Sequence, residues 1–193
     1  MRVVIIKYNA GNIRSVDFAL KRMNVNAEIT DDPEKIMNAD KVIFPGVGEA
    51  STTMKYLHTR KLDTLLKSLK MPVLGICLGQ QLMCAWSEEG IVDCIGIFDQ
   101  PVRKFPPGEK VPHMGWNQLF DLSGDLYKGV EDGEYVYFVH SYYVPVCEDT
   151  AAKSEYIKPF SASLQKDNFY ATQFHPEKSG NTGFKIIKNF IAL

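Results

Sequence analysis

The clearest chemical feature of the sequence is a cysteine that stands between two glycines. Residues 75–79 read Gly-Ile-Cys-Leu-Gly, at the point where a short apolar run gives way to helix-like sequence. Nucleophile elbows have this pattern, because small flanking residues let a strand and a helix approach at a sharp turn. A helix start beside the thiol also favours the thiolate. Cys77 is therefore a candidate nucleophile, and a buried structural cysteine between packing glycines is the alternative.

Four histidines could supply the base that a cysteine nucleophile needs. His58 lies in a charged helical stretch and is expected to be solvated, whereas His113 and His140 lie in strand-like sequence, where structural histidines are common. His175 differs because it ends a strand and is followed two residues later by Glu177. A carboxylate at that spacing can return to the same side and hold the second imidazole nitrogen. We therefore expect a triad of the elbow cysteine, His175 and Glu177, although a structural turn also fits this segment alone.

A glycine-rich loop is the third feature with a chemical use. Residues 45–48 read Pro-Gly-Val-Gly and follow the apolar run 41–44. In an open parallel sheet, loops at the carboxyl ends of the strands line one crevice, so this loop and Cys77 should share an edge. Backbone N–H groups of such a loop can face an oxyanion. A phosphate-binding loop is the competing interpretation, but Ser51 stands where the third glycine would be and no Gly-Lys-Ser/Thr segment occurs.

The elements that would hold these residues alternate between strands and helices in the first half of the chain. Short β-branched runs are followed by amphipathic stretches, which is the pattern of parallel strands joined by crossover helices. The strands are apolar throughout, as expected when helices cover both faces of a sheet. We expect strands at 3–6, 27–30, 41–45 and 73–76, and helices at 13–23, 33–37, 51–69 and 78–87.

The second half has strand-like runs separated by Gly, Pro and Asp, with little helical periodicity. Mixed or antiparallel strands are expected at 117–121, 135–146, 160–165 and 169–173. A closing amphipathic helix at 179–192 would turn one apolar side inward, made by Phe184, Ile187, Phe190 and Ile191. The predicted fold is α/β: an open, mostly parallel, doubly wound sheet with flanking helices and extra mixed or antiparallel strands. We expect a single domain over residues 1–193.

Composition excludes several other classes of protein. The chain has 22 basic and 23 acidic side chains, and its formal net charge of -1 indicates neither nucleic acid nor a membrane surface as a partner. Residues 1–6 run straight into a strand without a leader, which predicts a cytoplasmic protein. The four cysteines have irregular spacing, so neither a zinc site nor a disulfide framework is indicated. No metal and no cofactor is predicted.

Three segments together resemble the class I, or triad-type, glutamine amidotransferases over almost the whole chain. They are residues 45–48, 75–81 (Gly-Ile-Cys-Leu-Gly-Gln-Gln) and 175–177 (His-Pro-Glu). The resemblance implies that Cys77 attacks the side-chain amide of glutamine, forming a thioester and releasing ammonia, and that water then gives glutamate. It implies that His175 moves the protons and that Glu177 orients His175.

The resemblance also assigns residues around that chemistry. The oxyanion hole would be formed by backbone N–H groups of Gly46, Val47, Gly48 and Leu78. The α-amino and α-carboxylate groups of glutamine would be fixed by Gln81, Ser141 and Tyr142. Ordinary core or strand packing is the alternative role for the last three residues.

Three further segments narrow the resemblance to the glutaminase subunits of imidazole glycerol phosphate synthases, from histidine biosynthesis. They are residues 11–15 (Gly-Asn-Ile-Arg-Ser), 112–117 (Pro-His-Met-Gly-Trp-Asn) and 137–142 (Tyr-Phe-Val-His-Ser-Tyr). The resemblance implies a heterodimer that channels ammonia to a (β/α)8-barrel synthase or cyclase subunit of the HisF type. Asn12, Trp116 and Lys178 are expected at the interface. The alternatives are a solvated Lys178 and a core Trp116.

Two departures from the family pattern leave a second pathway open. Residues 7–9 read Lys-Tyr-Asn where the family usually has Asp-Tyr-Gly, and residues 49–50 read Glu-Ala where an aromatic is common. A paralogous subunit that supplies ammonia for sugar amidination in surface glycan synthesis is therefore an alternative. A free-standing cysteine hydrolase or peptidase and a noncatalytic binding module are the others, but Gln81 argues against the former and the complete triad against the latter.

Overall fold

Strands and helices alternate through the first half of the chain, as the sequence predicts. The computed structural model describes residues 1–8 and 11–193, so Asn9, which belongs to one of the two departures, lies outside the described residues. The elements of this half are β1 (Val3–Ile6), α1 (Ile13–Lys21), β2 (Ala27–Thr30), α2 (Pro33–Met37), β3 (Lys41–Gly46), α3 (Ala50–Thr59), α4 (Leu62–Ser68), β4 (Val73–Cys77) and α5 (Leu78–Met83).

The second half is built mostly from strands and ends in a long helix. Its strands are β5 (Trp86–Ser87), β6 (Val92–Asp93), β7 (Pro101–Lys104), β8 (His113–Gln118), β9 (Tyr135–His140), β10 (Tyr142–Tyr143), β11 (Thr150–Tyr156), β12 (Lys158–Lys166) and β13 (Phe169–Thr172). Its helices are the short 3-10 turns η1 (Asp125–Tyr127) and η2 (Pro176–Lys178), followed by α6 (Gly180–Ala192). Among residues 1–8 and 11–193, no helix has the length and apolar character needed to cross a bilayer.

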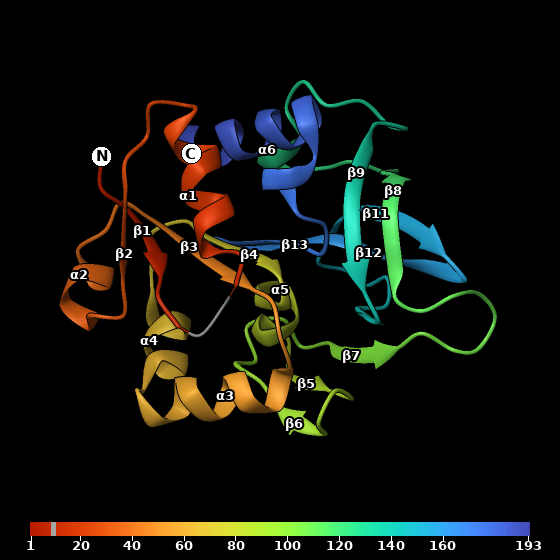
Figure 1. Cartoon of the computed structure of the whole chain (residues 1–193), viewed down its shortest axis with the longest axis horizontal. Coiled ribbons are helices and arrows are strands. Elements are labelled where there is room, and N and C mark those ends of the chain that lie inside the picture. The colour runs from red at the N-terminus through yellow and green to blue at the C-terminus, as the bar shows by residue number, and fades with distance from the viewer. Residues whose placement is uncertain (9–10) are drawn as a thin grey trace.

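One seven-stranded sheet runs through the molecule and carries the candidate site (Figure 1). Its order is β11-β12-β13-β4-β3-β1-β2, in which the strands from β13 to β2 are parallel and β11 and β12 are antiparallel additions. A small sheet of β10, β7, β5 and β6 and a two-stranded ribbon of β8 and β9 complete the architecture. The expected α/β fold is thus confirmed, with the antiparallel strands in the second half.

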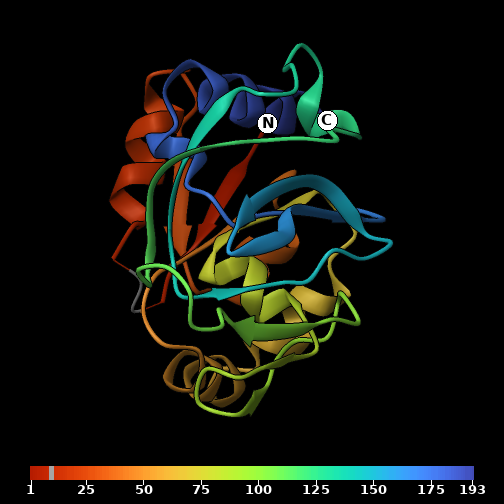
Figure 2. The ribbon, with the colours of Figure 1, turned by 90° about the vertical axis from the view of Figure 1, so that its right-hand side faces the viewer.

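Helices cover both faces of the parallel part of the sheet. Figures 1 and 2 show α1 and α6 on one side and α3 on the other. Val3 and Ile5 of β1 pack into the core cluster of α1 and α6, whereas Val4 and Ile6 pack into the cluster of α3, α4 and α5. Successive side chains of a strand point to opposite faces. A strand covered on both faces therefore has no exposed position, which explains the unbroken apolar runs.

Four predicted elements differ from the structure by more than two residues at a boundary. The expected strand 117–121 is β8, which begins at His113 and ends at Gln118 because it pairs with β9 over that range. The expected helix 51–69 is two helices, because Lys61 adopts a left-handed backbone with φ of 56° between α3 and α4. The expected helix 78–87 ends at Met83, where the extended backbone of Cys84 leads into β5. The expected strand 135–146 is broken at Ser141, since β9 pairs with β8 but β10 pairs with β7.

The closing helix also differs from expectation on one side. Ile187 and Phe190 are buried as predicted, but the Phe184 side chain is 42% exposed and Ile186 is buried in its place. On this helix Gly183 faces the segment before α6, and a Cβ on Gly183 would lie only 1.9 Å from the carbonyl oxygen of Pro176. This close approach holds η2 against α6.

Candidate active site

Cys77 lies at a strained turn between β4 and α5, as the elbow pattern predicts. Its backbone has φ of 56° and ψ of -109°, a region that non-glycine residues rarely adopt. A Cβ on Gly79 would lie 2.0 Å from the carbonyl oxygen of Phe44, and a Cβ on Gly75 would lie 2.5 Å from Met83 Sδ. Neither position can hold a side chain at this spacing, so both glycines are required by the turn.

His175 and Glu177 meet across a single proline. Nδ1 of His175 lies 2.9 Å from Oε1 of Glu177, and both side chains are fully buried. Burial alone would lower the pKa of His175, but the neighbouring Cys77 sulfur and the Glu177 carboxylate outweigh it and raise that pKa to about 10. An imidazole in this setting takes up a proton readily and holds it beside the sulfur, as a base for a thiol must.

Adjacent strands bring these residues together. The last residues of β4 and β13 are neighbours in the sheet, since Ile76 pairs with Thr172, and His175 follows β13 by three residues. Nε2 of His175 is buried without a hydrogen-bond partner in the described part of the chain. Because Nδ1 is occupied by Glu177, Nε2 is the nitrogen left for chemistry.

Cys77 and His175 line one pocket with a volume of about 290 Å³. This size suits a small molecule. The pocket wall is formed by Val47, Gly48, Cys77, Leu78, Gln81, Glu89, Pro112, Val139, His140, Ser141, Tyr142 and His175.

The residues expected to form an oxyanion hole lie beside Cys77. Gly46 is buried and pairs with Cys77 across β3 and β4, while Val47, Gly48 and Leu78 line the pocket. Leu78 is the first residue of α5, so its backbone N–H has no acceptor within the helix. The sheet thus brings the loop after β3 and the helix start after β4 to the same edge, and their role as an oxyanion hole stays a prediction.

The residues expected to bind an amino-acid substrate also line the pocket: Gln81, Ser141 and Tyr142. Gln81 is held by hydrogen bonds from its Nε2 to the carbonyl oxygen of Tyr142 at 3.1 Å and to Oε1 of Gln173 at 2.9 Å. Their contact with a substrate stays a prediction.

Glu89 is a pocket residue that sequence reasoning missed. Its Oε2 accepts a hydrogen bond of 2.9 Å from the backbone N–H of Ala50 at the start of α3. Burial and the nearby Glu49 carboxylate raise the pKa of Glu89, although the Ala50 hydrogen bond opposes the shift. In the sequence, Glu89 belongs to a charged turn, and only the pairing of β5 with β6 and β7 brings that turn to the pocket.

His113 and His140 form a buried pair whose hydrogen bonds leave no free nitrogen on His140. Nδ1 of His140 lies 2.8 Å from the carbonyl oxygen of Tyr142, which can only accept, so Nε2 of His140 must accept from Nδ1 of His113 at 2.9 Å. Burial lowers the pKa of His113 to about 4 and that of His140 to about 3. Both histidines are therefore neutral near pH 7. His58 is exposed and pairs with Asp63, as expected for a solvated residue.

The three residues expected at a partner interface differ in exposure. Trp116 is 55% exposed, which rules out a core role, and Lys178 is exposed as well. Asn12 is only 4% exposed, and its Nδ2 lies 3.5 Å from Oε1 of Glu177. The Asn12 side chain thus faces Glu177 and not the surface, contrary to the position expected for docking. Any part that Asn12 plays in docking stays a prediction.

The described residues contain no group of three or more His, Cys, Asp or Glu side chains that could hold a metal ion. Besides Cys77, the cysteines are free thiols packed in or beside the core. The geometry of Cys77 and His175 suits nucleophilic attack by the thiol with the imidazole as its base, and these roles stay a prediction.

A doubly wound sheet with an elbow cysteine and a His-Glu pair at its edge defines a class, and the comparisons agree. The family model for "Glutamine amidotransferase class-I" matches residues 5–193. This chain belongs to the class I glutamine amidotransferase family.

Two relatives match the chain over its full length and their own. One is the imidazole glycerol phosphate synthase subunit HisH of Bacteroides fragilis (strain YCH46), with 65% identity, and the other is the subunit of the same name from Escherichia coli (strain K12), with 46% identity. Among solved structures, a glutamine amidotransferase from Thermotoga maritima is 19% identical, with a TM-score of 0.64 over 100% of this chain and 83% of that one. At that identity, the structural likeness concerns the fold alone.

Proposed function

We propose that this chain is the glutaminase subunit of an imidazole glycerol phosphate synthase, acting in histidine biosynthesis. The observation that carries the proposal is the convergence of Cys77 and His175 on one pocket, with Glu177 held 2.9 Å behind His175. The 65% identity to a HisH subunit over the full length of both chains supports this pathway over sugar amidination.

The site supports a two-step hydrolysis of glutamine. His175 takes the proton of the Cys77 thiol, and the thiolate attacks the side-chain carbonyl carbon of glutamine. The C–N bond breaks as His175 returns a proton to the leaving ammonia, which leaves a thioester on Cys77. Water, deprotonated by His175, then attacks the thioester, so that glutamate leaves and the thiol is restored. Backbone N–H groups of the loop after β3 and of Leu78 would stabilise the oxyanion in both steps.

The pocket wall offers complementary groups for an amino acid. Ser141 carries a hydroxyl donor for the α-carboxylate, and the Glu89 carboxylate provides a negative charge for the α-ammonium, while Gln81 borders the substrate with both of its amide hydrogens held by Tyr142 and Gln173. The assignment of Glu89 adds a charged partner to the residues expected from the sequence. It also accounts for a partly buried carboxylate that makes no ion pair within the described residues.

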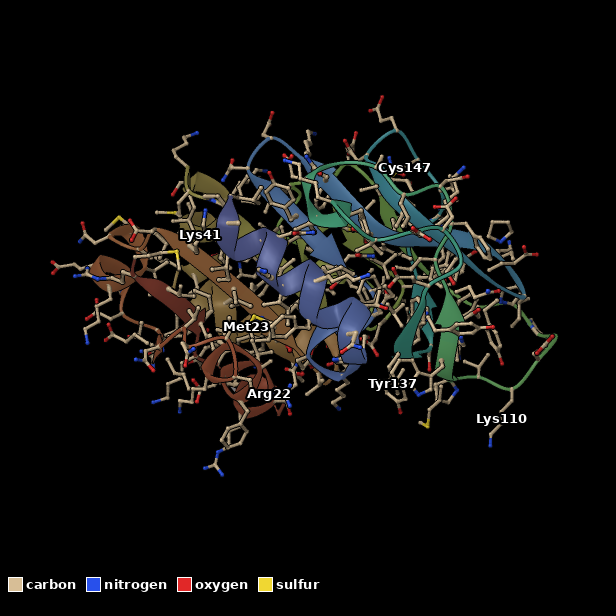
Figure 3. All side chains as sticks on the ribbon, turned by 90° about the horizontal axis from the view of Figure 1, so that it is seen from above. Arg22, Met23, Lys41, Lys110, Tyr137 and Cys147 are labelled. Carbon is tan, nitrogen blue, oxygen red and sulfur yellow. The ribbon has the colours of Figure 1, made fainter. Side chains whose placement is uncertain are left out.

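The exposed side chains around Trp116 support docking of a (β/α)8-barrel subunit of the HisF type at this edge. Met114 and Trp116 are two residues apart on β8 and therefore lie on the same face, and both are more than half exposed. Trp116 pairs with Tyr137 of β9, which lies where β9 meets the segment before α6 (Figure 3). A Cβ on Gly180 would lie 3.9 Å from the Trp116 ring, so Trp116 lies beside the start of α6, two residues after the exposed Lys178.

Glutamate release, measured with and without a HisF-type barrel subunit and its substrate, tests the proposal. We expect slow release by the free chain, a large rise in the complex, and none above background for Cys77→Ala. The Cys77→Ala complex should still use added ammonium, because only ammonia generation needs the thiolate. Cys147→Ser serves as the matched control and should keep its activity. Glutamate release by Cys77→Ala at the wild-type rate would overturn the assignment.

A further inference from the structure

A fully buried glutamine next to the nucleophile has no role in the mechanism above. Gln173 directly follows β13, and its side chain has no exposed surface. Its Nε2 donates to the sulfur of Cys77 at 3.8 Å, and its Oε1 accepts from Gln81 at 2.9 Å. A buried amide is usually held by its hydrogen bonds. In Gln173, the amide N–H donates to the sulfur of the candidate nucleophile.

The direction of the Gln173 amide follows from its neighbours. Nε2 of Gln81 lies near two oxygens, the carbonyl oxygen of Tyr142 at 3.1 Å and Oε1 of Gln173, so it must be the amide nitrogen. Tyr142 is fixed in turn, because Nδ1 of His140 donates to the same carbonyl oxygen at 2.8 Å. With Oε1 of Gln173 turned to Gln81, its Nε2–H can only point to Cys77. The orientation is therefore set by a chain of hydrogen bonds.

The contacts of the sulfur change when the thiol ionises. The Cys77 thiol donates to the carbonyl oxygen of Val139 at 3.9 Å, and a thiolate cannot make that bond. The N–H of Gln173 keeps its bond and gains strength, because hydrogen bonds to charged acceptors are stronger than neutral ones. A donor at this place thus favours the thiolate over the thiol.

We propose that Gln173 is a positioning residue for Cys77: its side-chain N–H holds the sulfur in the pocket and stabilises the thiolate, while Gln81 fixes the direction of the amide. The proposal rests on the proposed function, in which Cys77 is the nucleophile. It gives Gln81 a second role. Gln81 lines the substrate pocket and also orients the Gln173 amide, whose N–H donates to the Cys77 sulfur. The Cys77 thiol is thereby linked to Val139 on β9 and to Gln173, the residue that follows β13.

Alkylation of Cys77 by iodoacetamide, followed by mass spectrometry as a function of pH, tests the proposal without requiring glutaminase activity. We expect Gln173→Met to raise the pH midpoint of alkylation by about one unit and to slow alkylation near neutral pH about tenfold, as loss of a hydrogen bond to a charged group would. In complex with the barrel subunit, the glutaminase kcat of this variant should fall by a similar factor with little change in KM. Gln81→Met should raise the midpoint by a smaller amount, because the Gln173 amide is then free to turn.

Gln80→Met is the matched control, because Gln80 is as buried as Gln173 and precedes Gln81 on α5, but its Nε2 donates to the carbonyl oxygen of Ser161. It should keep the wild-type midpoint. An unchanged midpoint in Gln173→Met overturns the proposal, as does an equal shift in Gln80→Met. If Gln173→Met does not fold, an unchanged midpoint in Gln81→Met overturns it instead. A wild-type complex without glutaminase activity would contradict the proposed function alone, since the alkylation result stands apart from it.

Discussion

Nδ1 of His175 and Oε1 of Glu177 lie 2.9 Å apart although a single proline separates the two residues. Neither side chain has exposed surface, so water does not compete for this hydrogen bond. The short turn η2 packs against α6 at Gly183. This turn brings the Glu177 side chain back toward the His175 ring. The tautomer of His175 is therefore set by local geometry, and Nε2 is directed away from the acid.

This relationship predicts unequal losses at the two residues. His175→Ala removes the proton carrier, whereas Glu177→Ala removes only its orientation. Glutaminase kcat/KM in the presence of the barrel subunit should fall for both, and roughly ten- to a hundredfold further for His175→Ala. Wild-type rates in both variants would show that neither residue belongs to the machinery.

The elbow makes a prediction about stability. Gly79→Ala brings a methyl group to 2.0 Å from the carbonyl oxygen of Phe44, and backbone cannot yield as a flexible side chain would. We expect a loss of more than about 3 kcal/mol in the free energy of unfolding, measured with urea, or no folded protein. Gly108→Ala is the control: its Cβ would meet Ile157 at 3.4 Å, an ordinary contact, and it should change stability by less than about 1 kcal/mol. Similar losses in both variants would contradict the steric explanation.

The buried histidine pair predicts how stability depends on pH. His113 and His140 have pKa values of about 4 and about 3 in the folded protein, below the ordinary value of about 6.5 expected on unfolding. Their contribution is complete above about pH 6.5 and is lost as the pH falls, because the unfolded chain then takes up protons that the folded chain refuses. Each histidine should lower the unfolding free energy by up to about 1.4 kcal/mol per pH unit in this range.

Urea unfolding at about pH 7 and about pH 5 measures this dependence. The double variant His113→Gln, His140→Gln should be less stable than wild type near pH 7 and should lose less stability on acidification. An unchanged slope would mean that the pair is protonated in the folded protein.

Docking provides the last prediction. Trp116→Ala and Lys178→Ala should each weaken binding to the barrel subunit in a titration, and by more than their effect on the unfolding free energy of the isolated chain. Trp116 should matter more, because half-exposed tryptophans are frequent centres of interface energy, whereas single surface lysines contribute little. Phe18→Ala on α1 removes another exposed aromatic and serves as the control. If both variants bind as tightly as wild type, the docking face lies elsewhere.

Local patterns were sufficient for the parallel half of the sheet. Strands such as 3–6 and 73–76 are short, apolar and bounded by helix-like sequence. Because both faces of these strands are buried, every position is apolar, and this pattern predicts a parallel strand. The split at Lys61 could not be predicted, because a lysine in the left-handed region gives no signal in the sequence. The strand Thr150–Tyr156 was missed because Lys153 and Glu155 interrupt its apolar run, while its partner β12 lies further along the chain.

In the candidate site, too, local motifs predicted some residues and distant pairings determined others. Cys77, His175 and Glu177 stand in short motifs whose spacing indicates their positions, and the structure brings all three together. Glu89 reaches the pocket and Gln173 reaches Cys77 through pairings between elements distant in sequence, so no local motif could reveal them. Asn12 is a residue that the sequence misplaced. It was expected at a surface, but it lies buried beside Glu177 because the start of α1 packs against η2.

The order β3-β4-β13 places Cys77 on a strand formed from residues 73–77 and His175 just after a strand formed from residues 169–172. Nearly a hundred residues must be made after Cys77 before His175 exists to pair with it. On the proposed mechanism, the growing chain carries the elbow cysteine before its base has been made, and we expect no hydrolysis until the last strand enters the sheet between β12 and β4. The order of strands thus makes completion of folding the event that switches the chemistry on.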